Sequence, residues 1–349
     1  NNMKTKLFKV LALILVAVLC LSALTACQSA GSPDSSSDPV DTASNPDTAT
    51  KDEGAVLRIG AQPFPLYSSI YAAKELGFLQ EEFGAIGAEF VWTEFNSGPL
   101  VNEAVAAGTQ DIGFMADQPA IVAKSSGQPI QIISNVAYGE KALALLVPKD
   151  SPATKIEDLK GKKVALVVGS YAQHLLVLLL EKAGLTVDDI ELVNLPASDQ
   201  PAALTTGQVD AIVIWEQYIS QLESDGVAKV IADGTGIKKG NMVTYAVKDY
   251  AEAHPLVIQA YIKASQRASD YIKSNPKEAA AAIAKNFNVT PELMEEILKK
   301  FSFDPVLSDG DIAEITKVKD YLLKAKIIEN DIDMSEFINT AYSEAALGK

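Results

Sequence analysis

The sequence predicts an α/β protein of two globular units, each a mostly parallel sheet flanked by helices. The chain has 349 residues, 48% hydrophobic and 21% charged, which is enough for a large core and long for a single unit. From residue 56 onward, short apolar runs alternate with helical patterns, as in right-handed βαβ units. Predicted strands such as residues 163–168 are apolar along most of their length, which is typical of strands that helices cover on both faces.

Composition excludes several classes of protein. Lys and Arg total 30 against 45 Asp and Glu, so the net charge is −15, the wrong sign for binding nucleic acid through its phosphates. Two cysteines and two histidines are too few for a disulfide scaffold or a Cys/His metal cage. We therefore expect no nucleic-acid partner, no metal site and no cofactor.

The first 26 residues have the pattern of an export signal. Lysines precede an apolar run at residues 10–21, and small residues lead up to Cys27. The run is shorter than the roughly 20 residues that span a bilayer. The sequence Leu-Thr-Ala-Cys, which ends at Cys27, resembles a bacterial lipoprotein box, and this implies cleavage before Cys27 and lipidation of its sulfur.

Residues 27–54 are rich in Ser, Asp, Thr, Pro and Ala, a composition that predicts a disordered tether. Removing residues 1–26 takes away three lysines and no acidic residue, so the charge of the mature chain becomes 27 − 45 = −18. Together, the signal, Cys27 and the tether predict a protein held by lipid at the extracytoplasmic face of a bacterial membrane.

The body begins with strands and helices in alternation. The predicted strands are residues 56–61, 88–94, 111–115, 130–135, 163–168, 190–195 and 210–215. The helices between them are residues 66–83, 99–107, 119–125, 172–183, 200–206 and 217–224.

After about residue 242 the pattern changes to helices alone. Residues 254–274 carry one apolar stripe with spacings of 4, 3, 4 and 3. Four further helices are predicted at residues 276–286, 291–301, 309–325 and 334–346. We expect this helical tail to pack back on the first globular unit.

Known catalytic and nucleotide motifs do not fit. The glycines at 234, 236 and 240 are spaced one residue too far apart for a dinucleotide loop, and a strand pattern rather than a helix follows them. The sequence contains neither a P-loop nor a nucleophile elbow. His174 and His254 lie on different predicted helices without a carboxylate at ligand spacing, which favours packing or surface roles.

The turn at residues 168–171 predicts an anion site. A strand ends at Val168, Gly169 and Ser170 form a tight turn, and a helix begins near Tyr171. Backbone N–H groups and the positive end of the helix dipole then point out of the carboxyl edge of the sheet. The other interpretation is that Ser170 is an ordinary N-cap.

This segment also carries a family resemblance. The sequence Gly-Ser-Tyr-Ala-Gln-His-Leu-Leu at residues 169–176 resembles the Gly-Ser-Ser-Ala-His-Tyr/Asn-Leu-Leu segment of the substrate-binding proteins of ABC importers for aliphatic sulfonates, taurine and nitrate. Five other segments agree in the family's order: residues 58–62, 95–99, 113–119, 146–152 and 209–218. The match spans about residues 56–250.

The resemblance implies a two-lobed clamp of the type II periplasmic-binding-protein class, with the ligand between the lobes. Lobe 1 would comprise residues 55–143 and 245–349, including the helical tail, and lobe 2 residues 144–244. The chain would cross between the lobes near residues 141–148 and 242–248.

The resemblance also implies which residues bind the ligand. Carried over position by position, they are Gln62, Asp117 and Gln118 from lobe 1 and Gly169, Ser170, Tyr171, Ala172, Gln173, Trp215 and Glu216 from lobe 2. Four of these depart from the family pattern: Gln173 stands for a His, Tyr171 for a small hydroxyl residue, Gln118 for a Thr and Glu216 for an Asp.

Four of these positions also have simpler structural interpretations. Trp215 is also consistent with a core residue, and Gln62 with the end of a strand. Asp117 is typical of a turn or N-cap. Glu216 is placed either to cap the following helix or to meet an amine on the ligand.

The function that the resemblance implies is capture of a small organosulfonate, such as an alkanesulfonate or taurine, or a related oxyanion, with no catalysis. The protein would be monomeric and would deliver the solute to an ABC permease and ATPase. Nitrate, bicarbonate, an aromatic carboxylate or a thiamine precursor remain alternative ligands, and a tethered sensor is an alternative role. A biosynthetic enzyme on the same fold is opposed by the export signal and by the lack of a reactive Cys or a His-paired nucleophile.

Overall fold

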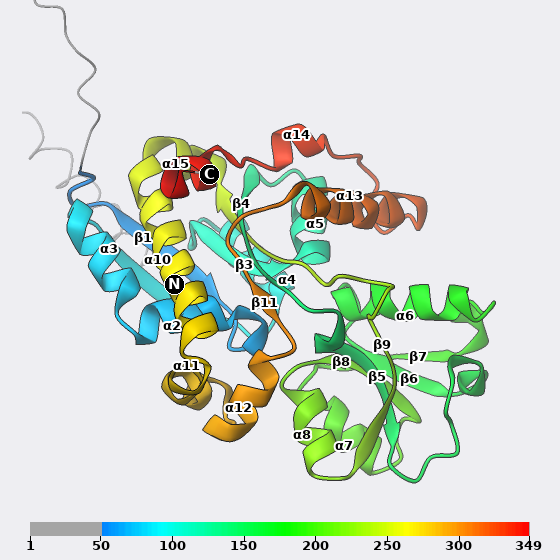
Figure 1. Ribbon diagram of the computed structural model, residues 1–349. Helices are drawn as coiled ribbons and strands as arrows, with labels where there is room; N and C mark the ends of the chain where they lie inside the picture. The colour runs from blue at the N-terminus through cyan, green and yellow to red at the C-terminus, as the bar shows by residue number, and fades with distance from the viewer. Residues whose placement is uncertain (1–50, 349) are drawn as a thin grey trace, which may run out of the picture. The chain divides into compact units, whose positions relative to one another are not determined.

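The computed structural model of the protein describes residues 51–348 (Figure 1). The predicted signal, Cys27 and most of the predicted tether lie outside these residues. Near the start of the described chain, the backbone N–H of Asp52 donates to Ile86 and that of Gly54 to Gly87, each at 2.9 Å. Among residues 51–348, no helix combines the length and apolar character that a membrane crossing requires.

The first sheet has six strands in the order β11-β4-β10-β3-β1-β2. Strand β1 is parallel to β2 and β3, whereas β10 is antiparallel to β3 and β4, and β11 is antiparallel to β4. We call this sheet and the helices on it lobe 1. Its strands are β1 (Val56–Ala61), β2 (Glu89–Glu94), β3 (Ile112–Ala116), β4 (Ile130–Tyr138), β10 (Met242–Val247) and β11 (Ser302–Phe303).

The second sheet has five strands in the order β7-β6-β8-β5-β9. Strand β6 is parallel to β7 and β8, and β5 is antiparallel to β8 and β9. We call this sheet and its helices lobe 2. Its strands are β5 (Leu143–Pro148), β6 (Lys163–Leu166), β7 (Glu191–Asn194), β8 (Ala211–Trp215) and β9 (Ala228–Asp233).

Both sheets are mixed, but most of the described strands in each run in one direction, as predicted: β10 and β11 run opposite to the others in the first sheet, and β5 does so in the second. Parallel neighbours need a crossover connection of a dozen or more residues, usually a helix. Helices provide such crossovers between the parallel strands, whereas β5 and β10 each enter their sheet from the other one and run antiparallel to their neighbours.

The helices between the strands follow the predicted pattern closely. The predicted helix at residues 66–83 is divided at Gly77, where a φ of 81° places the backbone in the left-handed region that glycine favours. The observed helices are α2 (Ser68–Glu75), α3 (Phe78–Ile86), α4 (Gly98–Ala106), α5 (Asp117–Ser125), α6 (Tyr171–Lys182), α7 (Gln200–Thr205) and α8 (Tyr218–Ser224).

The helical tail packs mainly on lobe 1. Helix α10 lies against α2, α3 and α15, and its predicted stripe is buried at Val257, Tyr261, Ala264 and Ala268. Helix α13 packs against α5 and reaches α6 of lobe 2 through Tyr321. The tail comprises α9 (Lys248–Ala253), α10 (Pro255–Ser274), α11 (Pro276–Ile283), α12 (Pro291–Leu298), α13 (Asp309–Lys324), α14 (Met334–Phe337) and α15 (Ala341–Leu347).

The chain crosses between the sheets at residues 139–142 and returns at residues 234–241. The first crossing begins and ends before the corresponding bounds of the predicted range 141–148, and the second lies entirely before the predicted range 242–248, because residues 143–148 and 242–247 are already strands of the sheet that the chain enters. Residues 242–244, assigned by prediction to lobe 2, consequently belong to lobe 1.

The two crossings run side by side. The N–H of Gly139 donates to the carbonyl of Lys239 at 3.1 Å, and the N–H of Gly234 donates to that of Glu140 at 2.9 Å. A Cβ at Gly234 would lie 2.6 Å from the Glu140 oxygen and 2.7 Å from the Lys238 oxygen. Only glycine therefore fits at position 234 without displacing backbone.

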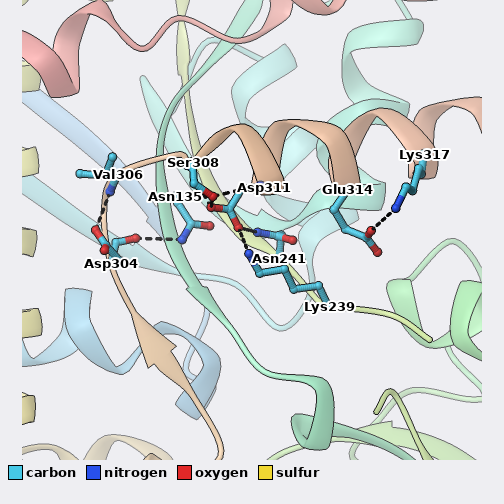
Figure 2. Close-up of polar contacts among 9 residues, drawn as sticks. All are labelled: Asn135, Lys239, Asn241, Asp304, Val306, Ser308, Asp311, Glu314 and Lys317. Carbon is cyan, nitrogen blue, oxygen red and sulfur yellow. Dashed lines mark hydrogen bonds and ion pairs between the residues drawn. The ribbon is translucent and has the colours of Figure 1, made fainter. Parts of the chain in front are cut away.

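The second crossing is tied to the start of α13 (Figure 2). Asp311 accepts hydrogen bonds from Asn241 Nδ2 at 2.7 Å and from Lys239 Nζ, and it also closes a capping box with Ser308. Burial acts to raise the pKa of Asp311, but the bonds from Lys239, Ser308 and Asn241 outweigh it and lower the pKa. The tail thus holds the crossing through an ionised carboxylate.

We predict that Gly234→Ala destabilises the protein by about 1–3 kcal/mol, because its Cβ would overpack two backbone oxygens. Urea denaturation measures the change in the free energy of unfolding. Gly84→Ala is the control: Gly84 lies inside α3, and a Cβ added there would have no heavy atom within 4 Å, so alanine should stabilise the protein by about 0.4–1 kcal/mol. Equal effects at the two positions would contradict the close approach of the crossings.

Candidate functional site

A cavity of about 30 Å³ lies where the carboxyl ends of strands from both sheets meet. Open α/β sheets bind ligands at this edge. Lobe 1 contributes residues that follow β1 and β3 and the start of α4, and lobe 2 contributes residues that follow β6 and end β8. The lining residues are Gln62, Phe64, Leu66, Tyr67, Ser97, Gly98, Pro99, Met115, Ala116, Pro119, Val167, Ser170, Tyr171 and Trp215.

Aromatic rings from both lobes meet at Trp215. Its ring centroid lies 5.8 Å from that of Phe64, at an interplanar angle of 79°, and 5.7 Å from that of Tyr171. Trp215 is only 6% exposed and Tyr171 only 5%. Apolar and aromatic side chains from opposite lobes therefore close the cavity together.

Two buried donors at the cavity have no hydrogen-bond partner among residues 51–348. They are the indole N–H of Trp215 and the hydroxyl of Tyr171. Burial raises the pKa of Tyr171 well above its ordinary value, so this hydroxyl stays protonated. Buried polar groups normally find a partner, and two unpaired donors at one cavity indicate a place where a ligand acceptor would be held.

The turn before α6 uses most of its own polar groups. Ser170 Oγ accepts from the Ala172 N–H at 3.2 Å and donates to the Val167 carbonyl at 2.6 Å, so the N-cap interpretation of Ser170 is confirmed. Gln173 Oε1 accepts from the Gly169 N–H at 2.9 Å. In the described part of the chain, the N–H of Tyr171 has no acceptor, which leaves one backbone donor of this turn for a ligand.

Asp117 is held in a fully buried ion pair. Its Oδ2 lies 3.2 Å from Lys238 Nζ in the second crossing, and neither side chain is exposed. Lys238 also lies 3.2 Å from His174 Nδ1 of lobe 2, and the His174 ring stacks on Tyr321 at 4.1 Å. Burial raises the pKa of Asp117, and the ammonium of Lys238 opposes this. The carboxylate faces its lysine and does not line the cavity.

Glu216 is likewise paired within the chain. It is fully buried, forms an ion pair with Lys300 of the tail, and accepts from Ser220 Oγ at 2.9 Å and from the Ser220 N–H at 3.1 Å. Burial raises the pKa of Glu216, and Lys300 opposes this. The sequence allowed Glu216 either to cap α8 or to meet an amine on the ligand. The structure confirms the capping, through the Ser220 N–H, and the amine that Glu216 contacts is that of Lys300.

The structure brings together only part of the predicted site. Gln62, Ser170, Tyr171 and Trp215 line the cavity, with Gln62 Nε2 donating to the Phe114 carbonyl at 2.8 Å. Gln118 is fully buried, and neither atom of its amide has a partner among residues 51–348. The predicted residues that do not line the cavity are Asp117, Gln118, Gly169, Ala172, Gln173 and Glu216.

Other lining residues were not predicted. Phe64 and Leu66 follow β1 just after Gln62, so the strand-end rule that selected Gln62 could have found them. Lys238 and Lys300 do not line the cavity but pair with Asp117 and Glu216. No local sequence pattern predicted these two ion pairs. Among residues 51–348 there is also no group of three His, Cys, Asp or Glu side chains placed to hold a metal ion.

Comparison with known proteins identifies the family. The family described as NMT1/THI5 like matches residues 65–279. The chain belongs to this family.

Three relatives show the range of similarity. The chain is 30% identical over 250 residues to a protein assigned as aliphatic sulfonates-binding in Escherichia coli (strain K12), covering 72% of this chain and 77% of the relative. It is 32% identical over 194 residues to the taurine-binding periplasmic protein of the same organism, covering 54% and 59%. The solved alkanesulfonate-binding protein of Xanthomonas axonopodis pv. citri bound to MOPS superposes with a TM-score of 0.75 at 29% identity, covering 83% of this chain and 99% of that one.

The buried His174 predicts acid sensitivity. Burial and the Lys238 ammonium lower the pKa of His174 to about 2. The unfolded chain takes up a proton on this residue below about pH 6.5, whereas the folded protein does not. Between pH 6.5 and the folded pKa the unfolded state thus binds more protons. The free energy of unfolding should fall on this account by up to about 1.4 kcal/mol per pH unit as the pH drops.

His174→Gln, which keeps an acceptor for Lys238, should flatten the pH dependence of unfolding below about pH 6.5. Urea denaturation at a series of pH values measures it. His254→Gln is the control, because His254 is the other histidine of the chain and its side chain is 33% exposed. A slope that His174→Gln leaves unchanged would contradict the buried neutral ring.

Proposed function

We propose that this protein is the extracytoplasmic solute-binding component of an ABC importer, capturing a small organosulfonate and delivering it to a membrane permease. The observation that carries the proposal is the cavity between the lobes, where buried neutral donors without partners face apolar side chains. Within residues 51–348, no Lys, Arg, His, Asp or Glu lines this cavity.

Neutral donors suit a sulfonate. Its group is ionised at physiological pH and offers three acceptor oxygens but no donor. The Trp215 N–H, the Tyr171 hydroxyl and the Tyr171 backbone N–H can each donate to such oxygens. Hydrogen bonds to a charged acceptor contribute about 1.5–3 kcal/mol each. Because the chain has a net charge of −15, its long-range field repels anions, and affinity must come from these local donors.

The relatives support the same class of ligand. Two are named for binding aliphatic sulfonates or taurine, and the third was solved with MOPS, which carries a sulfonate group. A binding role agrees with these relatives, each of which is named as a binding protein.

Binding requires the lobes to separate. Trp215, Tyr171 and Phe64 wall the cavity from both lobes and are each less than 10% exposed, so a sulfonate with a tail would reach it when the lobes move apart. The two adjacent crossings at residues 139–142 and 234–241 are the places about which the lobes would rotate.

The proposal extends to location and partners. Lipidation of Cys27, predicted from the sequence, would hold the protein at the extracytoplasmic face of the membrane next to its permease and ATPase. A monomer suffices for this role, since both walls of the cavity come from one chain.

Tyr171→Phe tests the proposal most cleanly. It removes an unpaired buried hydroxyl and keeps the ring, so the free energy of unfolding without ligand should be unchanged or slightly higher. Affinity for 1-propanesulfonate, measured by isothermal titration calorimetry, should fall about tenfold or more because one donor is lost.

Tyr261→Phe is the matched control. The Tyr261 hydroxyl is bonded to Thr244 at 3.0 Å inside lobe 1, so this change should cost about 1 kcal/mol of stability without changing affinity. If Tyr171→Phe bound the sulfonate as tightly as the parent, the anion would have to lie elsewhere.

A further inference from the structure

We infer that the site selects sulfonates whose tail carries no positive charge, and so prefers a simple alkanesulfonate or arenesulfonate to an amino sulfonate such as taurine. This inference rests on the proposed function. It concerns the part of the ligand beyond the sulfonate group, and it follows from where the carboxylates of the site are directed.

A ligand ammonium brought out of water needs an anionic partner. In the part of the chain that the structure describes, neither Asp nor Glu lines the cavity. The carboxylates next to it in the chain are Asp117, which follows Ala116, and Glu216, which follows Trp215. These two are the only sequence-predicted site residues that could neutralise an amine on the ligand.

Both carboxylates already have a cation from this chain. Asp117 pairs with Lys238 at 3.2 Å with both side chains fully buried. Glu216 pairs with Lys300 and also accepts two hydrogen bonds from Ser220. The two lysines therefore occupy the positions at which a ligand ammonium would find its charge partner.

The remaining lining favours hydrocarbon. Phe64, Leu66, Met115, Pro119 and Val167 present apolar surface to the cavity, which rewards burial of methylene or ring carbons. The aromatic rings offer a poor alternative partner for an ammonium, because the Trp215 ring is already in contact with the rings of Phe64 and Tyr171.

Calorimetry with two ligands of equal size tests the inference. Taurine and 1-propanesulfonate have the same heavy-atom skeleton, with an ammonium in one where the other has a methyl group. We expect 1-propanesulfonate to bind roughly 100-fold more tightly, because the unpaired ammonium is not compensated. Equal or tighter binding of taurine would overturn the inference and leave the proposed function standing. Binding of neither sulfonate would overturn both.

Two variants at Ser97 isolate the role of charge. Ser97 lines the cavity as the N-cap of α4, and its side chain makes no capping hydrogen bond. Asp and Asn are both favoured N-caps, so both should preserve the fold. Ser97→Asp should reduce the preference for 1-propanesulfonate over taurine by about tenfold or more, and Ser97→Asn should leave that preference in place. If the ratio of the dissociation constants for taurine and 1-propanesulfonate were the same in both variants, a missing carboxylate would not be the reason for the selection.

Discussion

Two buried carboxylates next to the cavity, Asp117 and Glu216, are each paired with a lysine of the same chain, and the character of the site depends on this pairing. Asp117 and Glu216 are fully buried, which is tolerable only because Lys238 and Lys300 meet them. With these charges compensated, the cavity between the lobes is left with neutral donors and apolar surface. A strongly acidic protein can thereby present a site that does not repel an anion at short range.

The same lysines connect the site to the crossings. Lys238 lies in the second crossing and contacts Asp117 of lobe 1 and His174 of lobe 2, while Lys300 comes from the tail and reaches Glu216 of lobe 2. Separation of the lobes would bring water to these groups. Burial of these charges is costly and opposes the closed arrangement, whereas the ion pairs that Lys238 and Lys300 form across the junction support it. Asp311 adds support by holding Lys239 and Asn241 at the end of the crossing.

The local sequence pattern was sufficient to predict most of the helices and strands and part of the site. Strand β1 has the bounds that its apolar run predicted, and Gln62, Ser170, Tyr171 and Trp215 line the cavity because each lies just beyond or at the end of a predicted strand. Strand β5 was mistaken for a crossing because no helix separates it from β4. Strand β9 was not predicted, since its residues are mostly half-buried and include Lys229 and Asp233, so it lacks a long apolar run. The ion pairs were beyond such reasoning, because they join residues 121 and 84 positions apart.

The salt dependence of sulfonate affinity tests this account most directly. The dissociation constant for 1-propanesulfonate would be measured by calorimetry from about 20 mM to about 500 mM sodium gluconate, a range over which screening becomes nearly complete. If neutral donors hold the anion, the dissociation constant should stay constant or fall as screening weakens the repulsion from the acidic chain. A rise of about tenfold or more would show that a cation of the protein pairs with the sulfonate, and would contradict the neutral site described above.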